Sequence, residues 1–474
     1  MNARIRNLFG LVTALFAVLI AFTTYWAVFE ADDLEANRAN KRPLLEEQQI
    51  RRGLIIARDG TVIARNRAVG ESPRFYERIY PEGALFAHPV GYSFVERGRV
   101  GLEREYNNDL TGKRDEFESL LDEIRGRERE GNDVFTTLDP EAQQVARDGL
   151  AGRNGSVVAI EPATGRVRAL VSIPSYDPNE VPRRFGDLSR APGSPLLDRA
   201  VQSGYPPGST MKVVTATAAL DTGRYSPNSV VSGRSPKRIG GVPLNNFGNE
   251  DFGPITLTTA LTNSVNTVWG EVGQKLGKET MFEYMRRYGF DRKPLIDLPR
   301  DEIRASGVYG RGGRLLDADD AIDIGRVAIG QERLQVTPLQ MGLVAAGVAN
   351  GGSLMRPHLV EQVKDRDGRT VRRVKPSEQN RVMKESTAAQ LASMMSDVVR
   401  EGTGTAAALQ GIDVGGKTGT AEVGNDINQA WFIGFAPVGN PRVAVAVTVE
   451  RTTGQGGTVA APIAKSVMES LLRG

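Results

Sequence analysis

The sequence predicts an α/β protein whose main domain packs helices against an antiparallel sheet. Residues 156–160 and 166–171 are strand-like and flank a Pro-Ala-Thr-Gly turn, and residues 429–435 and 442–450 are strand-like and flank a loop bounded by two prolines. The chain between these two pairs is mostly helical in pattern. We therefore expect the two pairs to share one antiparallel sheet on which the helices pack. The expected helices cover residues 256–261, 316–330, 338–349 and 386–399, and a helix over about 462–472 closes the chain.

An uncharged apolar segment, residues 8–29, lies close to the N-terminus. At about 1.5 Å per residue, a helix of this length crosses a bilayer core of roughly 30 Å. Arg4 and Arg6 precede the segment and four acidic residues closely follow it, so the positive-inside rule places the N-terminus in the cytoplasm. The run is longer than the ~7–15 apolar residues of a cleaved signal peptide, and no clear cleavage site follows it. We expect a single-pass anchor in the cell membrane, with the rest of the chain outside the cytoplasm.

The part of the chain after the anchor is too long for one ordinary domain. Residues 31–49 are polar and charged, which indicates a stalk, and residues 53–64 contain an Asp-Gly turn between two apolar runs, which predicts a β-hairpin. Residues 113–130 predict a solvated amphipathic helix, and Asp139-Pro140 predicts a helix start. The composition shifts after Gly131. The expected division is a cytoplasmic tail (1–7), a transmembrane anchor (8–29), a stalk with a small α+β domain (30–130) and a large α/β domain (131–474).

The composition excludes several kinds of chemistry. The chain has no cysteine, so a thiol nucleophile and a cysteine-based zinc site are impossible. Its two histidines, His88 and His358, lie in proline-flanked segments and are expected to be structural. The 60 basic and 57 acidic residues are mixed along the chain without a long basic run, so nucleic-acid binding has no support.

Ser209 and Lys212 form the only Ser-x-x-Lys motif of the chain and open an almost wholly apolar run. Residues three apart share one face of a helix, so the hydroxyl and the amine can meet. An apolar helix of this kind is expected to be buried, and burial disfavours the charged form of lysine. A neutral amine beside a hydroxyl is a base beside a nucleophile. With histidine and cysteine so scarce, lysine is the most plausible base for an activated serine.

Two further motifs complete a candidate site. Ser264-Val-Asn266 follows a short helical run, and Lys417-Thr-Gly419 opens a strand-like region. Ser-x-x-Lys, a Ser-Asp-Asn type of motif and Lys-Thr-Gly form the set found in class A β-lactamases and penicillin-binding proteins, and their order is the same here. A competing Ser-x-Asn motif begins at Ser226, but too little chain separates it from Lys212 to complete the buried helix and return to its start. We therefore expect Ser264 to supply the second motif.

With these motifs the chain resembles a class B penicillin-binding protein, a serine D,D-transpeptidase of peptidoglycan, and most closely the actinobacterial PbpA type. The resemblance implies a penicillin-binding and serine β-lactamase-like transpeptidase domain, in which an antiparallel sheet is packed by helices. It also implies a small non-catalytic, dimerisation-like pedestal and one transmembrane helix. Val265 stands where β-lactamases commonly have Asp, but the matching Ser and Asn are in place. Other segments similar to the family are 52–60, 101–106, 174–178, 198–200, 330–338 and 401–404.

The resemblance implies a role for each motif residue. Ser209 would attack the carbonyl between the two D-alanines of a stem peptide, with Lys212 as base and Ser264 as proton relay. Asn266 would orient Lys212 and the substrate amide, while the backbone N–H groups of Ser209 and Thr420 would form the oxyanion hole. The remaining motif residues would bind substrate: Lys417 places positive charge near the terminal carboxylate, Thr418 and Thr420 offer it hydroxyls, and Gly419 lets the substrate backbone lie close. The reaction requires no metal and no cofactor.

Three other functions share features with this one. A β-lactamase has the same motifs but is normally a smaller, released domain, which the anchor argues against. A D,D-carboxypeptidase differs only in using water to resolve the acyl-enzyme, and a mainly scaffolding subunit of the cell-wall synthesis complex would tolerate degenerate motifs. The expected partners are peptidoglycan stem peptides, β-lactam antibiotics, the plasma membrane and, by the resemblance, a RodA/FtsW-type glycosyltransferase. The sequence leaves open whether the protein serves elongation or division, and which diamino acid the acceptor carries.

Overall fold

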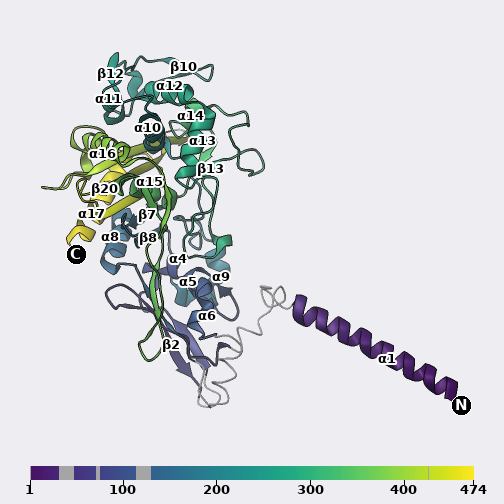
Figure 1. Ribbon diagram of the computed structural model, residues 1–474. Helices are drawn as coiled ribbons and strands as arrows, with labels where there is room; N and C mark the ends of the chain where they lie inside the picture. Colours follow the sequence, from purple (N-terminus) through teal and green to yellow (C-terminus); the bar gives the residue numbers. More distant parts are fainter. Residues whose placement is uncertain (1, 31–46, 71–74, 114–129, 425, 474) are drawn as a thin grey trace.

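The computed structural model describes residues 2–30, 47–70, 75–113, 130–424 and 426–473 (Figure 1). Most of the expected stalk and nearly all of the expected helix at 113–130 lie outside these ranges. Helix α1 (Asn2–Thr24) continues into a π-helical turn at Tyr25–Phe29. The span Ala3–Val28 is long and apolar enough to cross a membrane, and none of its most apolar window is buried. One N-terminal apolar helix of this kind is compatible with a single-pass membrane anchor.

A six-stranded sheet forms the lower end of the folded body in Figure 1, opposite the end that carries β10 and β12. The predicted N-terminal hairpin is confirmed, because Ile55 pairs with Ala64 and Ala57 donates to the Thr61 carbonyl at 2.8 Å. The strand order of the six-stranded sheet is β17-β16-β6-β1-β2-β3, so the sheet combines segments from both sides of the expected division after residue 130. The strands are β1 (Ile55–Ile56), β2 (Val62–Val69), β3 (Phe75–Ile79), β6 (Asp133–Thr136), β16 (Val360–Lys364) and β17 (Thr370–Arg373).

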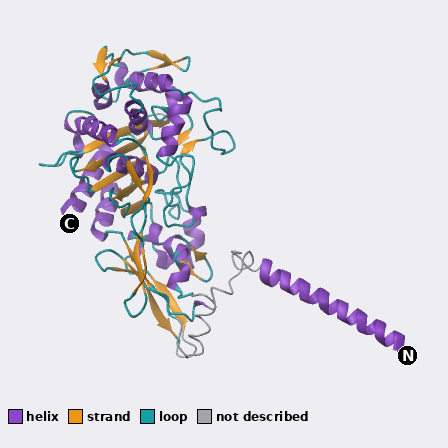
Figure 2. Ribbon diagram, in the orientation of Figure 1, coloured by secondary structure: helices purple, strands orange, loops and turns teal. Residues whose placement is uncertain are grey.

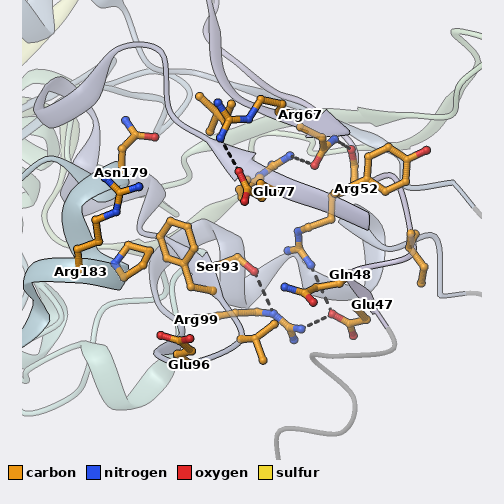
Figure 3. Close-up of a pocket in the computed structure, with 18 residues that line it drawn as sticks. Glu47, Gln48, Arg52, Arg67, Glu77, Ser93, Glu96, Arg99, Asn179 and Arg183 are labelled. Carbon is orange, nitrogen blue, oxygen red and sulfur yellow. Dashed lines mark hydrogen bonds and ion pairs between the residues drawn. The ribbon is translucent and has the colours of Figure 1, made fainter. Parts of the chain in front are cut away.

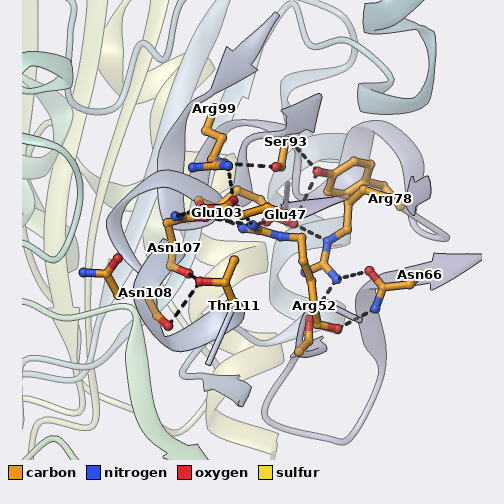
Figure 4. Close-up of polar contacts among 12 residues, drawn as sticks. Glu47, Arg52, Asn66, Arg78, Ser93, Arg99, Glu103, Asn107, Asn108 and Thr111 are labelled. Carbon is orange, nitrogen blue, oxygen red and sulfur yellow. Dashed lines mark hydrogen bonds and ion pairs between the residues drawn. The ribbon is translucent and has the colours of Figure 1, made fainter. Parts of the chain in front are cut away.

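A buried ion cluster links strand β3 of this sheet to the helical segment at residues 101–105 (Figure 4). Glu103 is fully buried; one of its carboxylate oxygens accepts a hydrogen bond from Arg52 at 2.9 Å and the other accepts one from Arg78 at 2.6 Å. Burial alone would raise the pKa of Glu103, but the two guanidinium groups outweigh burial and lower it. Glu103 lies in α5 (Gly101–Glu105), next to α6 (Asn107–Leu110), α4 (Ala87–Val90) and the short pair β4 (Ser93–Phe94) and β5 (Gly98–Arg99).

A cavity of about 660 Å³ opens beside the cluster (Figure 3). It lies between β2, β3, the β4–β5 pair and the start of α9 (Val181–Arg190). Arg67 and Glu77 face each other across β2 and β3 at 2.6 Å, and Arg99 pairs with Glu47. Most of the charged side chains that line the cavity are therefore paired with one another.

The same helical segment that carries Glu103 joins the two parts of the body. Tyr106 donates to Asp297 at 3.0 Å, and Asp297 also accepts the backbone N–H groups of Leu359 and Val360 at 2.6 and 2.9 Å. Because Val360 begins β16, Asp297 positions the strand that leaves the large domain and enters the six-stranded sheet.

The large domain is built on a five-stranded antiparallel sheet that is buried on both faces (Figure 2). Its order is β19-β20-β21-β7-β8, which confirms that the two predicted strand pairs share one sheet. Alternate residues enter different cores: Val157 packs with α8 and α17 on one face, and Val158 packs with α15 on the other. The strands are β7 (Gly155–Ile160), β8 (Val167–Ile173), β19 (Gly415–Gly424), β20 (Ile427–Ala436) and β21 (Val443–Thr452), and the helices are α8 (Pro140–Leu150), α15 (Pro338–Ala349), α16 (Glu385–Arg400) and α17 (Ala461–Arg473).

One expected helix is wrong. Residues 316–330 form a loop that contains only α14 (Ile324–Val327). Aspartate side chains here accept backbone N–H groups locally: Asp320 from Asp317 at 3.0 Å, Asp317 from Asp319 at 3.1 Å, and Asp323 from the first turn of α14. Such bonds offer the backbone an alternative to helix. The other expected helices that fall within the described residues are confirmed, including α8 with Asp139 as its N-cap.

Two helices match expected segments: α10 (Lys212–Asp221) is the buried apolar helix that follows Ser209, and α11 (Leu257–Thr262) matches the expected segment 256–261. Other elements of the large domain were not predicted individually. The helices are α9, α12 (Asn266–Leu276) and α13 (Lys278–Arg287). The short strands are β9 (Val230–Ser232), β10 (Lys237–Ile239), β11 (Val242–Leu244), β12 (Pro254–Thr256), β13 (Gly307–Val308), β14 (Leu334–Gln335), β15 (Ser353–Met355) and β18 (Glu378–Arg381).

Candidate active site

Ser209 stands on a 3₁₀ turn, Gly208–Met211, that leads directly into the buried helix α10. Gly208 has φ of 51° and donates to the Gly330 carbonyl at 3.1 Å. A Cβ atom on Gly208 would lie 2.9 Å from the Thr420 carbonyl oxygen, and one on Gly330 would lie 2.0 Å from the Gly208 carbonyl oxygen. The turn is therefore held between β19 and the Gly330 turn, and glycine is required at both close approaches. Ser209 itself is half-buried.

The Lys212 amine is fully buried and contacts the second motif. Its Nζ atom lies 2.7 Å from the Ser264 carbonyl oxygen, 2.6 Å from Oδ1 of Asn266 and 3.2 Å from the Ser264 hydroxyl. Burial lowers the pKa of Lys212 well below its ordinary value, and the charge of Lys417 lowers it further. A neutral amine has two N–H groups and one lone pair. The carbonyl and amide oxygens can only accept, so the lone pair is left for the Ser264 hydroxyl.

The Ser209 hydroxyl makes no hydrogen bond to any residue that the structure describes, Lys212 included. The sequence predicts only that the two groups can meet, and in this structure Lys212 bonds Ser264 and Asn266 instead. Catalytic hydrogen bonds often tighten only when substrate is bound.

Ser264 lies between two amines. Its hydroxyl lies 3.2 Å from the Lys212 Nζ and also accepts a hydrogen bond from the Lys417 Nζ at 2.9 Å. It sits in the turn between α11 and α12 with φ of 57°, a left-handed conformation that costs a non-glycine residue of order 1–3 kcal/mol. Asn266 begins α12, and its amide donates to the Asn245 carbonyl at 3.1 Å, which fixes its oxygen toward Lys212. Ser226 is exposed, bonds Ser229 and does not line the cleft.

The third motif lies on β19, the terminal strand of the five-stranded sheet. Lys417 is fully buried, and burial lowers its pKa to about 7. The Thr418 hydroxyl lies 2.6 Å from that of Thr403, and the Thr420 hydroxyl accepts the Gly456 N–H at 3.2 Å. A Cβ atom on Gly419 would lie 2.7 Å from the Pro207 carbonyl oxygen. In this structure Gly419 thus accommodates the loop that precedes the nucleophile.

The three motifs meet at one cleft of about 1170 Å³. Ser209, Ser264, Asn266, Thr418 and Thr420 line it, while Lys212 and Lys417 are buried at its wall. The prediction from sequence did not include several polar residues that also line the cleft. Thr403 lies in the family-like segment 401–404, which was a usable signal. The other polar residues are Asn245, Asn246, Asn249, Asn263, Gln331, Thr405, Glu422, Asp426, Asn428, Thr453, Gln455 and Thr458.

Neither histidine lies at the cleft. His88 is buried with its Nε2 atom 2.9 Å from the Pro195 carbonyl, and burial lowers its pKa to about 4. His358 is also buried, and its Nδ1 atom lies 3.3 Å from the Arg356 carbonyl. Within the described ranges, no three His, Asp or Glu side chains are placed to hold a metal ion. The three motifs supply hydroxyls, amines and an amide to the cleft, and Glu422 and Asp426 add two carboxylates to its lining.

Comparison with known protein families gives two matches along the chain. Residues 155–469 match the penicillin binding protein transpeptidase domain, and residues 52–134 match the penicillin binding protein A dimerisation domain. The peptidoglycan D,D-transpeptidase PbpA of Mycolicibacterium smegmatis is 36% identical over the whole of this chain and 99% of its own length. PbpA of Mycobacterium tuberculosis is 35% identical over the full length of both chains.

Solved structures agree with these matches. The ceftriaxone acyl-enzyme complex of penicillin-binding protein A from M. tuberculosis superposes with a TM-score of 0.82 at 33% identity, over 90% of this chain and 100% of that one. The imipenem acyl-enzyme complex of the same protein gives a TM-score of 0.81 at 33% identity, with the same coverage.

Proposed function

The chain belongs to the class B penicillin-binding protein transpeptidases, and we propose that it is a serine D,D-transpeptidase that cross-links peptidoglycan stem peptides through an acyl-enzyme on Ser209. One observation carries the assignment of residues: the Ser264 hydroxyl lies between two buried amines, beside the cleft that exposes Ser209. The same acyl-enzyme chemistry makes the protein a target of β-lactams, as in the acyl-enzyme complexes of its relative.

In the first half-reaction the Ser209 oxygen attacks the carbonyl carbon between the two D-alanines. The neutral Lys212 takes the hydroxyl proton, and backbone N–H groups of Ser209 and Thr420 stabilise the oxyanion. The C–N bond then breaks. A proton reaches the leaving nitrogen through the Ser264 hydroxyl, which can pass it from either amine. D-Alanine departs and the stem peptide remains esterified to Ser209.

In the second half-reaction an amine of a neighbouring stem peptide attacks the ester carbonyl. Lys212 again accepts the proton, a new amide bond forms, and the released Ser209 oxygen takes that proton back from Lys212. In the first half-reaction, before D-alanine departs, Lys417, Thr418 and Thr420 bind the terminal carboxylate of the donor, and Asn266 holds Lys212 and the substrate amide in place. Attack by water in place of the amine would give a D,D-carboxypeptidase. The acylation chemistry of the cleft is common to the two activities and does not distinguish them.

Covalent labelling tests this proposal. Fluorescent penicillin should label the full-length protein and should not label Ser209→Ala, while Ser226→Ala serves as a matched serine control and keeps its label. Labelling of Ser209→Ala equal to that of the wild type would contradict the assignment. Release of D-alanine from a stem peptide, measured with and without an added amine acceptor, then separates transfer to the amine from hydrolysis.

We further propose how the protein is placed in the cell. Residues 1–7 lie in the cytoplasm, residues 8–29 cross the plasma membrane once, and residues 30–130 form the stalk and most of the pedestal. Residues 131–474 form the transpeptidase domain outside the cytoplasm and also supply β6, β16 and β17 to the pedestal sheet. Arg4 and Arg6 at one end of the apolar helix support this orientation. A RodA/FtsW-type glycosyltransferase is the proposed partner of the anchor and pedestal. Co-purification of the full-length protein with one such enzyme tests that proposal.

A further inference from the structure

We propose that Glu422 determines donor specificity by binding a side-chain ammonium on the third residue of the donor stem peptide, counted with the terminal D-alanines as residues four and five. The inference rests on the proposed function, because it needs a D-Ala-D-Ala peptide in this cleft. The preferred donor is a stem peptide whose diamino acid carries a free amine.

Glu422 continues the row of residues that binds the donor. Thr418, Thr420, Glu422 and Gly424 are alternate residues of β19, and all four line the cleft. Alternate residues of a strand point to the same side. Glu422 pairs in register with Asn428 of β20, which also lines the cleft. The carboxylate therefore stands on the same wall as the two threonine hydroxyls, one step farther from Lys417.

The spacing along β19 matches the spacing along an extended peptide. β19 is the terminal strand of its sheet, and an extended peptide can lie along such an edge. Two residues of strand cover about 6.6–6.8 Å, and this is the separation between Thr420 and Glu422 along the chain. The same length of extended donor separates the terminal D-alanine from the third residue. With the terminal carboxylate at Thr418 and Thr420, the third residue lies opposite Glu422.

The charges of this end of the cleft favour a cation. Glu422 is exposed and makes no ion pair or hydrogen bond with any described residue. Among the described residues that line the cleft, the charged side chains are Glu422 and Asp426, both acidic. The two lysines of the site lie at the other end, buried in the wall. An ammonium entering beyond Thr420 thus meets an uncompensated carboxylate.

Two matched peptides test the assignment on the full-length protein in detergent micelles. One is Nα-acetyl-L-Lys-D-Ala-D-Ala, whose ε-amine is free, and the other is the Nα,Nε-diacetyl peptide, whose side chain is neutral. The readout is kcat/KM for D-alanine release, which counts each acylation whether water or amine resolves it. An exposed ion pair contributes little, so we expect the wild type to prefer the free amine by about two- to five-fold at low salt.

The variant Glu422→Gln should lower this preference to about one. The same variant should change the rate for the diacetyl peptide and the rate of penicillin labelling less than the rate for the free-amine peptide. Glu385→Gln, an exposed carboxylate on α16 outside the cleft, should keep the preference, and added salt should weaken it in the wild type. Equal rates for the two peptides in the wild type, or an unchanged preference in Glu422→Gln, would overturn the assignment of Glu422 alone. Absence of both penicillin labelling and D-alanine release would instead contradict the proposed function.

Discussion

The pH dependence of acylation should change in a defined direction when Lys417 loses its charge. We consider Lys417→Met, which keeps most of the side-chain volume. Lys212 must be neutral to act as base. The fall of the acylation rate at low pH, the acid limb of the profile, therefore follows the protonation of the coupled amines of Lys212 and Lys417. Burial and the charge of Lys417 together lower the pKa of Lys212. Removal of that charge makes protonation of Lys212 easier, so a higher pH is needed to keep it neutral.

The size of the effect follows from the distance between the two amines. Both nitrogens lie within 3.2 Å of the Ser264 hydroxyl oxygen, so they are separated by about 6 Å or less. At an effective dielectric constant of about 20, two charges at that distance repel by about 3 kcal/mol, which is roughly a hundredfold in equilibrium. Because the pKa of Lys417 is about 7, only part of this repulsion acts near neutral pH. We expect the acid limb to move upward by about one to two pH units.

The assay is the second-order rate of acylation by a fluorescent penicillin from pH 5 to pH 9. Thr418→Val is the matched control, because it removes a hydroxyl from the same carboxylate site without removing a charge. Thr418→Val should lower the rate at every pH and leave the midpoint of the acid limb in place. An unchanged midpoint in Lys417→Met, a downward shift, or the same shift in Thr418→Val would refute the electrostatic coupling of the two lysines.

Three other substitutions give defined outcomes. Ser264→Ala should lower penicillin acylation by about 10²–10⁴-fold, the usual value of a positioned proton relay, whereas Ser226→Ala should match the wild type. Glu103→Ala leaves two buried guanidinium groups uncompensated and should destabilise the pedestal by about 3–5 kcal/mol in urea unfolding. Arg104→Ala removes a half-buried side chain whose ion pair is open to solvent and should cost no more than about 1 kcal/mol, so similar unfolding midpoints for the two variants would contradict the buried cluster. Gly330→Ala should reduce acylation with little loss of pedestal stability, because its Cβ would meet the turn that carries the nucleophile; normal acylation would show that this turn can shift.

Local patterns in the sequence predicted the elements that carry a strong signal. The Asp-Gly hairpin, the Asp139 cap of α8 and the apolar α15 each rest on neighbouring residues, and all are confirmed. The expected helix at 316–330 failed for a local reason as well, because its aspartates bind their own backbone. A count of apolar residues does not detect this competition between side-chain and helical hydrogen bonds.

The candidate site was predictable as a set of motifs and not as a geometry. The three motifs were correctly expected to meet, since all of them border one cleft. The resemblance implied that Asn266 orients Lys212 and that Ser264 lies beside the amines, and the structure shows both contacts. The sequence could not indicate that the Ser209 hydroxyl is left unbonded, nor that Ser264 adopts a left-handed turn. Glu422 was likewise missed, since its position on the cleft wall follows only from the register of β19 with β20.

The origin of β16 and β17 has a consequence for biogenesis. The chain emerges from its N-terminus, so β1, β2, β3 and β6 are synthesised long before the segment that completes their sheet. Until then the outer edge of β6 exposes unpaired N–H and C=O groups, which invite pairing with other chains. The six-stranded sheet can therefore close only after most of the large domain has been synthesised. The late arrival of one hairpin would thus decide when the two domains become a single unit.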